Sequence, residues 1–249
     1  MKTIDQKVAI VTGGGSGIGK AISLLYASEG AKIVISDIDE NGSQETIAEI
    51  KAKGGEAIFV KADTSNSEDH KNVVEQALEK FGQLDIAVNN AGIGGPLAPT
   101  GEYPIDGWDK TIAINLSGVF YGMRYQIPAM LKSGGGSIVN VASILGKVGT
   151  PNSSAYVASK HGVIGLTEAA ALEYAQQNIR INSIGPGYIM TPLLKSLDDD
   201  TLKALVGLHP MGRLGASNEV AELALWLNSD KASFVTGAYY NVDGGYLAR

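Results

Sequence analysis

The chain contains no cysteine, only three histidines and no long uninterrupted apolar run. Without cysteine it has no disulfide, thiol nucleophile or thiolate metal site. His70, His161 and His209 are far apart in the sequence and lack ligand spacing such as H-x-x-x-H, so no metal site is expected. No apolar stretch approaches the roughly 20 residues of a membrane span, and the N-terminus lacks a signal-peptide hydrophobic region. These features favour a cytoplasmic protein.

Positive charge is also scarce, since 20 Lys and Arg residues face 26 Asp and Glu residues, for a formal net charge of -6. Such a chain offers no basic field for phosphates. The sequence therefore disfavours nucleic acid and anionic membrane surfaces as partners. A small-molecule partner is more consistent with this composition.

Short runs rich in Val and Ile alternate with longer helical patterns through much of the chain. Strands are expected at 7–13, 32–39, 56–63, 84–92, 136–143, 179–185 and 238–244, and helices at 19–31, 41–53, 66–81, 108–133, 154–176 and 217–228. Continuous apolar strands suit a sheet covered on both faces. The sequence predicts one α/β domain, residues 1–249, with a doubly wound parallel sheet and an insertion at 190–215.

A glycine-rich loop, "VTGGGSGIGK", joins the first expected strand to the first helix. Glycines permit tight turns, and a helix N-terminus offers free N–H groups to a pyrophosphate. Gly13, Gly17 and Gly19 are the candidate contacts, in a T-G-x-x-x-G-x-G pattern rather than the common G-x-G-x-x-G. The alternative is a purely structural turn.

Asp37 ends the second expected strand, eighteen residues beyond Gly19. An acidic residue about twenty positions past such a loop accepts hydrogen bonds from the adenosine ribose. Its charge would repel a 2′-phosphate, and the next residue, Ile38, supplies no cation, so NAD is predicted in preference to NADP. Alternatively, Asp37 caps the helix that follows or is an ordinary surface charge.

Tyr156 and Lys160 stand four residues apart in "YVASK" and would share one face of a helix. A tyrosine with a pKa near 10 is ionised in only about one molecule in a thousand at pH 7, which is equivalent to roughly 4 kcal/mol. An ammonium about 4 Å away offsets a similar amount at an effective dielectric of about 20. The pair is therefore predicted to act as an acid/base group, although a ring packed on a lysine stem would have the same spacing.

Ser143 ends another expected strand, thirteen residues before Tyr156. Open α/β sheets bind ligands at the carboxyl ends of their strands, where the glycine-rich loop also opens. The hydroxyl of Ser143 could donate a hydrogen bond to the reacting oxygen. A turn or helix cap is its alternative role.

Together these residues resemble the short-chain dehydrogenase/reductase family, and the resemblance covers nearly the whole chain. The matching pieces, in the family's order and spacing, are "TGGGSGIG" at 12–19, Asp37, Asp63, "NNAG" at 89–92, Asn115, Ser143, "YVASK" at 156–160 and "GPGYIMT" at 185–191.

The resemblance implies a three-layer Rossmann-like fold with a seven-stranded sheet, assembled into a homotetramer through its two long helices and C-terminal segment. The implied catalytic residues are Asn115, Ser143, Tyr156 and Lys160, with Lys160 lowering the pKa of Tyr156 and holding the nicotinamide ribose. The implied cofactor-binding residues are Gly13, Ser16, Gly17, Ile18, Gly19, Asp37, Ile38, Asp63, Thr64, Asn89, Ala91, Gly92, Tyr156, Lys160, Pro186, Gly187, Ile189 and Thr191.

The segment 188–211 is expected to cover the substrate as a lid. Its apolar residues favour an uncharged ketone or secondary alcohol; they are Leu193, Leu194, Leu197, Leu202, Leu205, Val206 and Met211. An amphipathic helix packed on the core would show similar spacing.

The predicted function is NAD(H)-dependent hydride transfer between nicotinamide and a ketone or secondary alcohol. A 3-oxoacyl-acyl-carrier-protein reductase is the alternative within the enzyme class. A regulatory protein that binds NAD without turnover is the alternative from another class, but it would not need Ser143, Tyr156 and Lys160 together.

Overall fold

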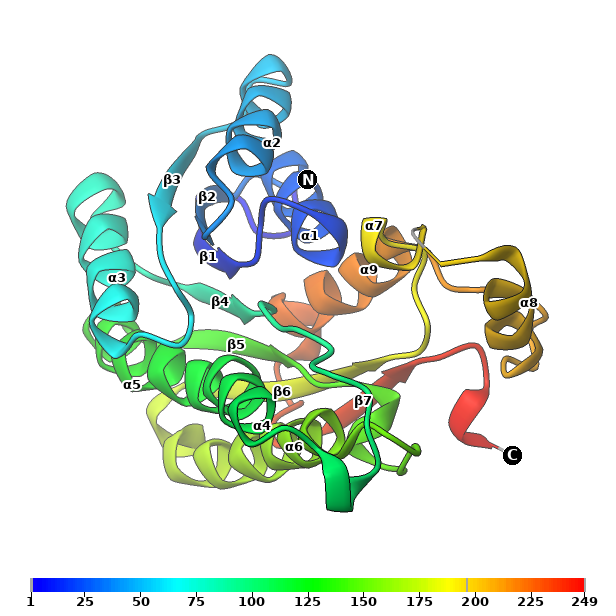
Figure 1. Ribbon diagram of the computed structural model, residues 1–249. Helices are drawn as coiled ribbons and strands as arrows, with labels where there is room; N and C mark the ends of the chain where they lie inside the picture. The colour runs from blue at the N-terminus through cyan, green and yellow to red at the C-terminus, as the bar shows by residue number, and fades with distance from the viewer. Residues whose placement is uncertain (1, 196, 249) are drawn as a thin grey trace.

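A seven-stranded parallel sheet forms the centre of the molecule in a computed structural model that describes residues 2–195 and 197–248 (Figure 1). The strands are β1 Val8–Thr12, β2 Lys32–Asp37, β3 Ala57–Lys61, β4 Ile86–Asn89, β5 Gly136–Val141, β6 Ile179–Pro186 and β7 Tyr239–Val242. Their spatial order is β3-β2-β1-β4-β5-β6-β7, with every neighbouring pair parallel. The doubly wound Rossmann-like fold predicted from the sequence is confirmed.

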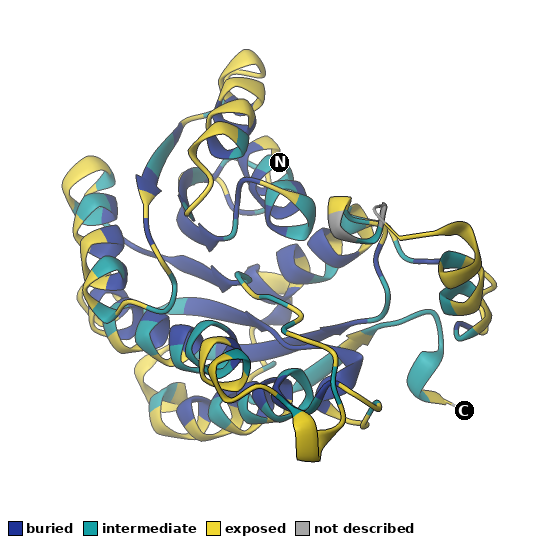
Figure 2. Ribbon diagram, in the orientation of Figure 1, coloured by how far each residue is buried: buried dark blue, intermediate teal, exposed yellow. Residues whose placement is uncertain are grey.

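Helices cover both faces of this sheet. They are α1 Gly17–Ser28, α2 Glu40–Ala52, α3 Ser67–Phe81, α4 Ile105–Ile112, α5 Gly118–Lys132, α6 Ser154–Tyr174, α7 Pro192–Lys195, α8 Asp199–Gly207 and α9 Ser217–Asn228. One core cluster joins the sheet to α1, α2 and α9, and another joins it to α3, α5 and α6. The central strands β1, β4, β5 and β6 are mostly dark blue between the helical layers in Figure 2, and all five residues of β1 are buried. This double burial accounts for the continuous Val and Ile runs.

A buried amide network ties the sheet to the helices on one face. Asn89 and Gln126 exchange two side-chain hydrogen bonds, of 2.9 and 3.1 Å. Asn89 also donates to Asn140, which in turn donates to Thr167 on α6. The four side chains are almost completely buried, and each has partners, so the network carries little desolvation penalty.

The expected helix at 108–133 differs from the structure. In the structure this part of the chain consists of α4, a π-helical turn at Ala113–Ser117 and α5. The first of these helices begins three residues earlier than expected. Asn115 lies in the wide turn and bonds to the backbone of Ile93 outside the helix. Hydrophobic periodicity does not reveal such a turn, which is often found at functional sites.

The insertion expected at 190–215 contains α7 and α8. No residue of α8 is buried, and the helix projects from the body of the molecule in Figures 1 and 2. Across the described ranges, no helix combines the length and apolar character needed to cross a bilayer.

Candidate active site

The carboxyl ends of the parallel strands gather most of the predicted site residues at one edge of the sheet. The connections that follow β1 to β6 at this edge carry the glycine loop, Asp37, Asp63, "NNAG", Ser143 and Gly187. Tyr156 and Lys160 belong to the first two turns of α6.

The glycine loop has the geometry of a phosphate cradle. Gly13 and Gly17 have positive φ angles of 66° and 52°, which favour glycine. A β-carbon at Gly19 would overlap the carbonyl of Gly13. The backbone at Gly19 therefore lies closer to the backbone at Gly13 than any other residue would allow. Ser16 caps α1 through its backbone and is exposed, with Ile18 half-buried behind it. The N-terminus of a twelve-residue helix behind a glycine-rich loop suits a dinucleotide pyrophosphate.

Thr12 fixes this loop to the next strand, a role that sequence reasoning did not assign. Its hydroxyl accepts the backbone N–H groups of Asn90 and Ala91, at 2.9 and 3.0 Å. The Asn90 side chain donates back to the carbonyls of Thr12 and Gly13. The "NNAG" segment is therefore held against the glycine loop.

Asp37 lies at the end of β2 with its carboxylate against the same loop. One oxygen accepts the N–H of Gly15 at 3.0 Å, and the other accepts that of Asp39 at 3.0 Å. Asp39, not Asp37, caps α2, which removes the capping alternative. Ile38 is exposed beside Asp37 and brings no positive charge.

Asp63 and Thr64 follow β3 at the same edge. The Asp63 carboxylate accepts both the N–H and the hydroxyl of Ser65, and these bonds lower the pKa of Asp63. The methyl group of Thr64 fills the space left by Gly118 at the start of α5. Asp63 is exposed, and its lowered pKa keeps it ionised at neutral pH.

Asn89 differs from the other residues of "NNAG". Its side chain is 2% exposed and belongs to the amide network, because Gln126 and Asn140 satisfy it inside the core. The predicted cofactor contact of Asn89 is therefore restricted to its backbone. Gly92 lies in the groove, since a β-carbon there would be 3.2 Å from Asn115 Oδ1 and 3.6 Å from Lys160 Nζ.

Asn115 is completely buried at the widened helical turn. Its amide accepts the N–H of Ile93 and donates to the carbonyl of Ile93, both at 2.8 Å, and also reaches Ser159 on α6 at 3.3 Å. The structure thus brings Asn115, Gly92 and Lys160 together, as the sequence analysis expected.

Ser143 follows β5 and caps a short 3-10 helix, Ile144–Gly146. Its Oγ accepts the N–H of Leu145 at 3.1 Å, which leaves the hydroxyl hydrogen free to point elsewhere. Burial raises the pKa of Tyr156, and a hydrogen bond with Ser143 lessens this rise. Ser143 therefore serves as a cap and also contacts Tyr156.

Lys160 and Tyr156 share one face of α6, as predicted. Lys160 is 4% exposed, and its Nζ donates to the carbonyl of Val141 at 2.8 Å and lies 5.6 Å from the centroid of the Tyr156 ring. Burial lowers the pKa of Lys160 to about 8.

Burial opposes the acidity predicted for Tyr156. Burial raises the pKa of Tyr156 above its usual value, the hydrogen bond with Ser143 opposes this rise, and the nearby Tyr188 phenol adds to it. Desolvation of the phenol is thus the largest influence on its pKa. Tyr156 is a protonated donor in this structure, which suits a general acid.

The connection after β6 holds the remaining cofactor candidates. Pro186 ends β6, and Gly187 donates its N–H to Val242. Thr191 lies near Gly17, whose β-carbon would be 3.4 Å from the methyl of Thr191. The Ile189 side chain, in contrast, is 4% exposed and belongs to the core, so the predicted contact of Ile189 is restricted to its backbone.

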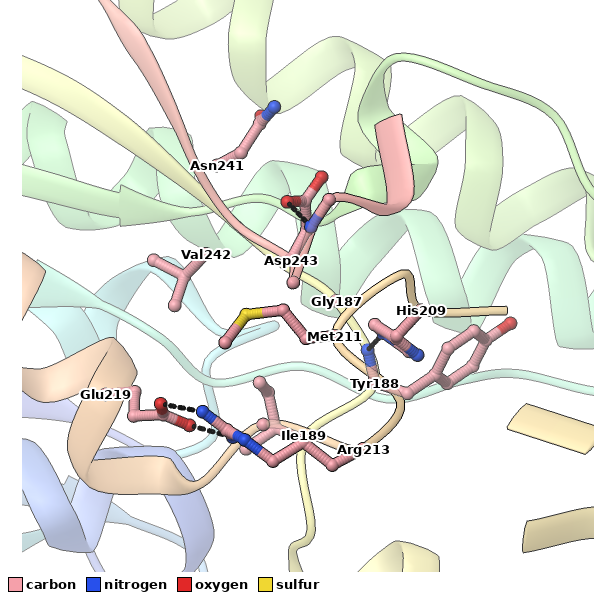
Figure 3. A pocket seen from close by; sticks show the side chains of 13 residues that line it. Gly187, Tyr188, Ile189, His209, Met211, Arg213, Glu219, Asn241, Val242 and Asp243 are labelled. Carbon is pink, nitrogen blue, oxygen red and sulfur yellow. Dashed lines mark hydrogen bonds and ion pairs between the residues drawn. The ribbon is translucent and has the colours of Figure 1, made fainter. Parts of the chain in front are cut away.

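A cavity of about 320 Å³ lies beside this connection and is drawn in Figure 3. Met211 is one of its lining residues and is drawn centrally among them in Figure 3, and the exposed Arg213 and Glu219, which also line it, form an ion pair through two hydrogen bonds. His209 is buried; its Nε2 accepts the N–H of Tyr188 at 3.2 Å, and its Nδ1 donates to the carbonyl of Leu205 at 2.9 Å. These two bonds define the neutral tautomer with the proton on Nδ1.

His209 therefore links the end of α8 to the residue that approaches Tyr156. The rings of Tyr188 and His209 meet edge to face, with centroids 5.8 Å apart. Sequence reasoning considered His209 only as a metal ligand, which its spacing disfavoured, and assigned Tyr188 no role. The feature of the sequence that could have drawn attention to Tyr188 and His209 is their position within the expected lid.

The predicted lid, 188–211, leaves and rejoins the body at one point. Ile189 pairs with Gly215, and Met190 donates its N–H to the carbonyl of Gly215 at 2.8 Å. Between these ends α8 has no buried residue, unlike an amphipathic helix packed on the core. Ser196 and the side chain of Leu193 lie outside the described residues.

Within the described part of the chain, no group of three or more His, Asp or Glu side chains is arranged to hold a metal ion. The site instead combines a glycine-rich helix N-terminus, the carboxylate of Asp37 beside it, and the side chains of Ser143, Tyr156 and Lys160. This arrangement can hold a dinucleotide and move a proton to or from a substrate oxygen.

Comparisons with known proteins agree with this site. Residues 13–247 match a family model described as enoyl-(acyl carrier protein) reductase. The chain is 52% identical to a cyclohexanol dehydrogenase of Acinetobacter sp. over 98% of this chain and 96% of the relative. It is 39% identical to a 3-oxoacyl-acyl-carrier-protein reductase of Thermotoga maritima over 98% and 99% of the two chains.

Among solved structures, a carveol dehydrogenase from Mycobacterium avium in complex with NAD superimposes with a TM-score of 0.96 at 29% identity, covering all of both chains. The extent of these matches agrees with the order of the strands in the sheet and with the residues found at the strand ends. The chain therefore belongs to the short-chain dehydrogenase/reductase family of oxidoreductase enzymes.

Proposed function

We propose that this protein catalyses the NAD(H)-dependent interconversion of a cyclic secondary alcohol and its ketone. The observation that carries the proposal is the meeting of Ser143, Tyr156 and buried Lys160 beside the glycine loop. Similarity to a cyclohexanol dehydrogenase supports an alcohol on a six-membered ring as the substrate class. The half-buried apolar residues of α8, which include Leu202 and Leu205, are consistent with an uncharged ring.

Each residue of the site has a distinct task in this reaction. The nicotinamide ring, when bound, accepts the hydride from the carbinol carbon or returns it to the carbonyl carbon. Tyr156 takes the hydroxyl proton during oxidation and gives a proton to the carbonyl oxygen during reduction. Ser143 donates a hydrogen bond that holds the same oxygen, and Lys160 stabilises the ionised phenol.

Asn115 supports this arrangement from the widened helical turn. Its bonds to Ile93 and Ser159 join the "NNAG" segment to α6, which carries Tyr156 and Lys160. A proton released through Lys160 would pass along the backbone near Asn115 and Gly92.

NAD is preferred over NADP because Asp37 projects toward the glycine loop without a neighbouring cation. Its carboxylate bonds to Gly15, and Ile38 is exposed beside it. A 2′-phosphate at that position would meet a like charge. The NAD in the carveol dehydrogenase structure supports the same preference.

The experiment is a panel of oxidations and reductions that follows NADH and NADPH absorbance. The substrates are cyclohexanol, a cyclohexanediol, cyclohexanone and an acetoacetyl thioester. The proposal is supported if the enzyme is active with the ring substrates and NAD(H). It also requires that Tyr156→Phe loses this activity while it still binds the dinucleotide. Full activity of Tyr156→Phe refutes the proton-transfer role.

A 3-oxoacyl-acyl-carrier-protein reductase is the second candidate, favoured by the 39% identical relative. Preference for the acetoacetyl thioester and NADPH would select it. A protein that binds NAD without turnover would oxidise or reduce nothing in the panel.

A homotetramer is the proposed assembly. Large apolar side chains are exposed on the long helices and near the last strand, as expected for surfaces covered by other copies; they are Phe120, Leu172, Trp226 and Phe234. Light scattering after size-exclusion chromatography should give four times the mass of the 25.9 kDa chain. A monomer would exclude this assembly.

A further inference from the structure

Tyr239, in the last strand of the sheet, hydrogen-bonds to the backbone of Ser143. Its hydroxyl donates to the Ser143 carbonyl at 2.9 Å, from a position 96 residues away in the sequence. Ser143 follows β5, whereas Tyr239 opens β7, and β6 lies between these two strands. The side chain of Tyr239 must therefore cross a whole strand to reach the carbonyl of Ser143.

Gly185 provides the room for this crossing. Tyr239 pairs with Ser183 on β6, and Gly185 is two residues farther along on the same face. A β-carbon at Gly185 would overlap the hydroxyl and ring of Tyr239. A glycine inside a buried strand often marks such a close approach.

The hydrogen bond from Tyr239 completes the set that fixes Ser143. The Ser143 carbonyl also accepts the N–H of Gly146 at 2.9 Å, so both of its lone pairs are engaged. Ser143 Oγ accepts the N–H of Leu145 at 3.1 Å. The ring of Tyr239 also packs under Lys147, whose Nζ is 5.1 Å from its centroid. Tyr239 thus contacts both ends of the turn that carries the serine.

The hydroxyl of Tyr239 remains a donor throughout the useful pH range. Burial, and to a lesser extent the charge of Asp243, raise the pKa of Tyr239 well above its ordinary value. The bond to Ser143 is therefore not lost when the medium becomes alkaline.

We propose that Tyr239 is a positioning residue for Ser143: it holds the peptide of the serine so that the hydroxyl faces the substrate oxygen beside Tyr156. Tyr239 touches neither substrate nor cofactor in this role and acts only through Ser143. The inference rests on the proposed function, in which Ser143 orients the reacting oxygen.

The test compares Tyr239→Phe with Tyr240→Phe. The first change removes only the donor oxygen and keeps the ring. The second removes a hydroxyl from the next residue, whose ring packs on Trp226 instead. Loss of one hydrogen bond should lower kcat of Tyr239→Phe about three- to tenfold. KM for alcohol and for NAD should stay within about twofold, and Tyr240→Phe should match the wild type.

Ser143→Ala, alone and combined with Tyr239→Phe, separates the inference from the proposed function. If Tyr239 acts through Ser143, the double variant should be no slower than Ser143→Ala alone. Multiplied losses in the double variant, or unchanged kcat in Tyr239→Phe, would overturn the inference. Full activity of Ser143→Ala would instead overturn the proposed role of the serine.

Urea unfolding and NADH fluorescence titration of each variant provide the second readout. At most the small shift of the unfolding midpoint that one lost hydrogen bond causes is expected, with unchanged dinucleotide affinity and a fall in kcat. A loss of kcat that tracks loss of stability or of NADH binding would mean a general structural role and would refute the inference.

Discussion

Replacing Lys160 with methionine should separate the charge of this residue from its bulk. The Lys160 Nζ is 5.6 Å from the centroid of the Tyr156 ring. At an effective dielectric of about 20, unit charges at this separation attract by about 3 kcal/mol. Removing the ammonium should therefore slow alcohol oxidation at pH 7 roughly a hundredfold, because the phenol must lose its proton in that direction.

The pH dependence distinguishes this explanation from simple damage. Without the positive charge the pKa of Tyr156, already raised by burial, rises further, so the oxidation profile of Lys160→Met should move about two units toward alkaline pH. The advantage of the wild type should shrink above the Lys160 pKa of about 8, because the ammonium loses its charge there.

The assay is steady-state NADH formation from cyclohexanol over a range of pH, with Lys32→Met as the matched control. Lys32 also faces an aromatic ring, 6.0 Å from the centroid of Phe81, but it begins β2 at the opposite edge of the sheet. A Lys160→Met enzyme that is equally slow at every pH, or as fast as the wild type, would refute the electrostatic reasoning.

Three further predictions concern other parts of the molecule. Asp37→Ser removes the carboxylate at the glycine loop, so the ratio of kcat/KM for NADP over NAD should rise roughly tenfold or more, and an unchanged ratio would contradict the charge argument. His209→Phe keeps a ring but loses the bonds to Tyr188 and Leu205, and should lower the free energy of unfolding by about 2 kcal/mol in urea, while a wild-type midpoint would show that these bonds contribute nothing. Burial lowers the pKa of His70, so the unfolded chain binds the proton more readily than the folded chain. The contribution of His70 to stability should therefore be fully present above about pH 6.5 and be lost as the pH drops through the lower pKa of the folded state. In thermal unfolding, His70→Gln should show a weaker dependence of stability on pH.

The sequence predicted the sheet and most of its helices because periodicity and burial agree in this fold. The runs around Val8–Thr12 and Lys32–Asp37 are apolar without alternation, and both strands are covered on two faces. The helix expected at 217–228 matches α9 in both bounds. The π-helical turn at Ala113–Ser117 could not be predicted, because it depends on a contact between Asn115 and a distant backbone.

Part of the site could be predicted because some of its residues are recognised by their place in the local backbone. Glycine spacing and strand ends identify Gly13, Gly17 and Asp37, because their roles follow from local backbone geometry. The desolvation of the Tyr156 phenol was not foreseen, because spacing along a helix does not show how deeply a side chain is buried. Tyr239 was missed altogether, since its contact depends on the register of three strands.

The single pairing of Ile189 with Gly215 has a consequence for how this scaffold can change. Lengthening the segment around α8, between Thr191 and His209, leaves the sheet register and the proton-transfer residues in place, and each doubling of such a loop costs only about 0.6 kcal/mol in closure entropy. Substrates with rings of other sizes can therefore be accommodated by changes in the α8 segment, while the sheet and the proton-transfer residues are retained.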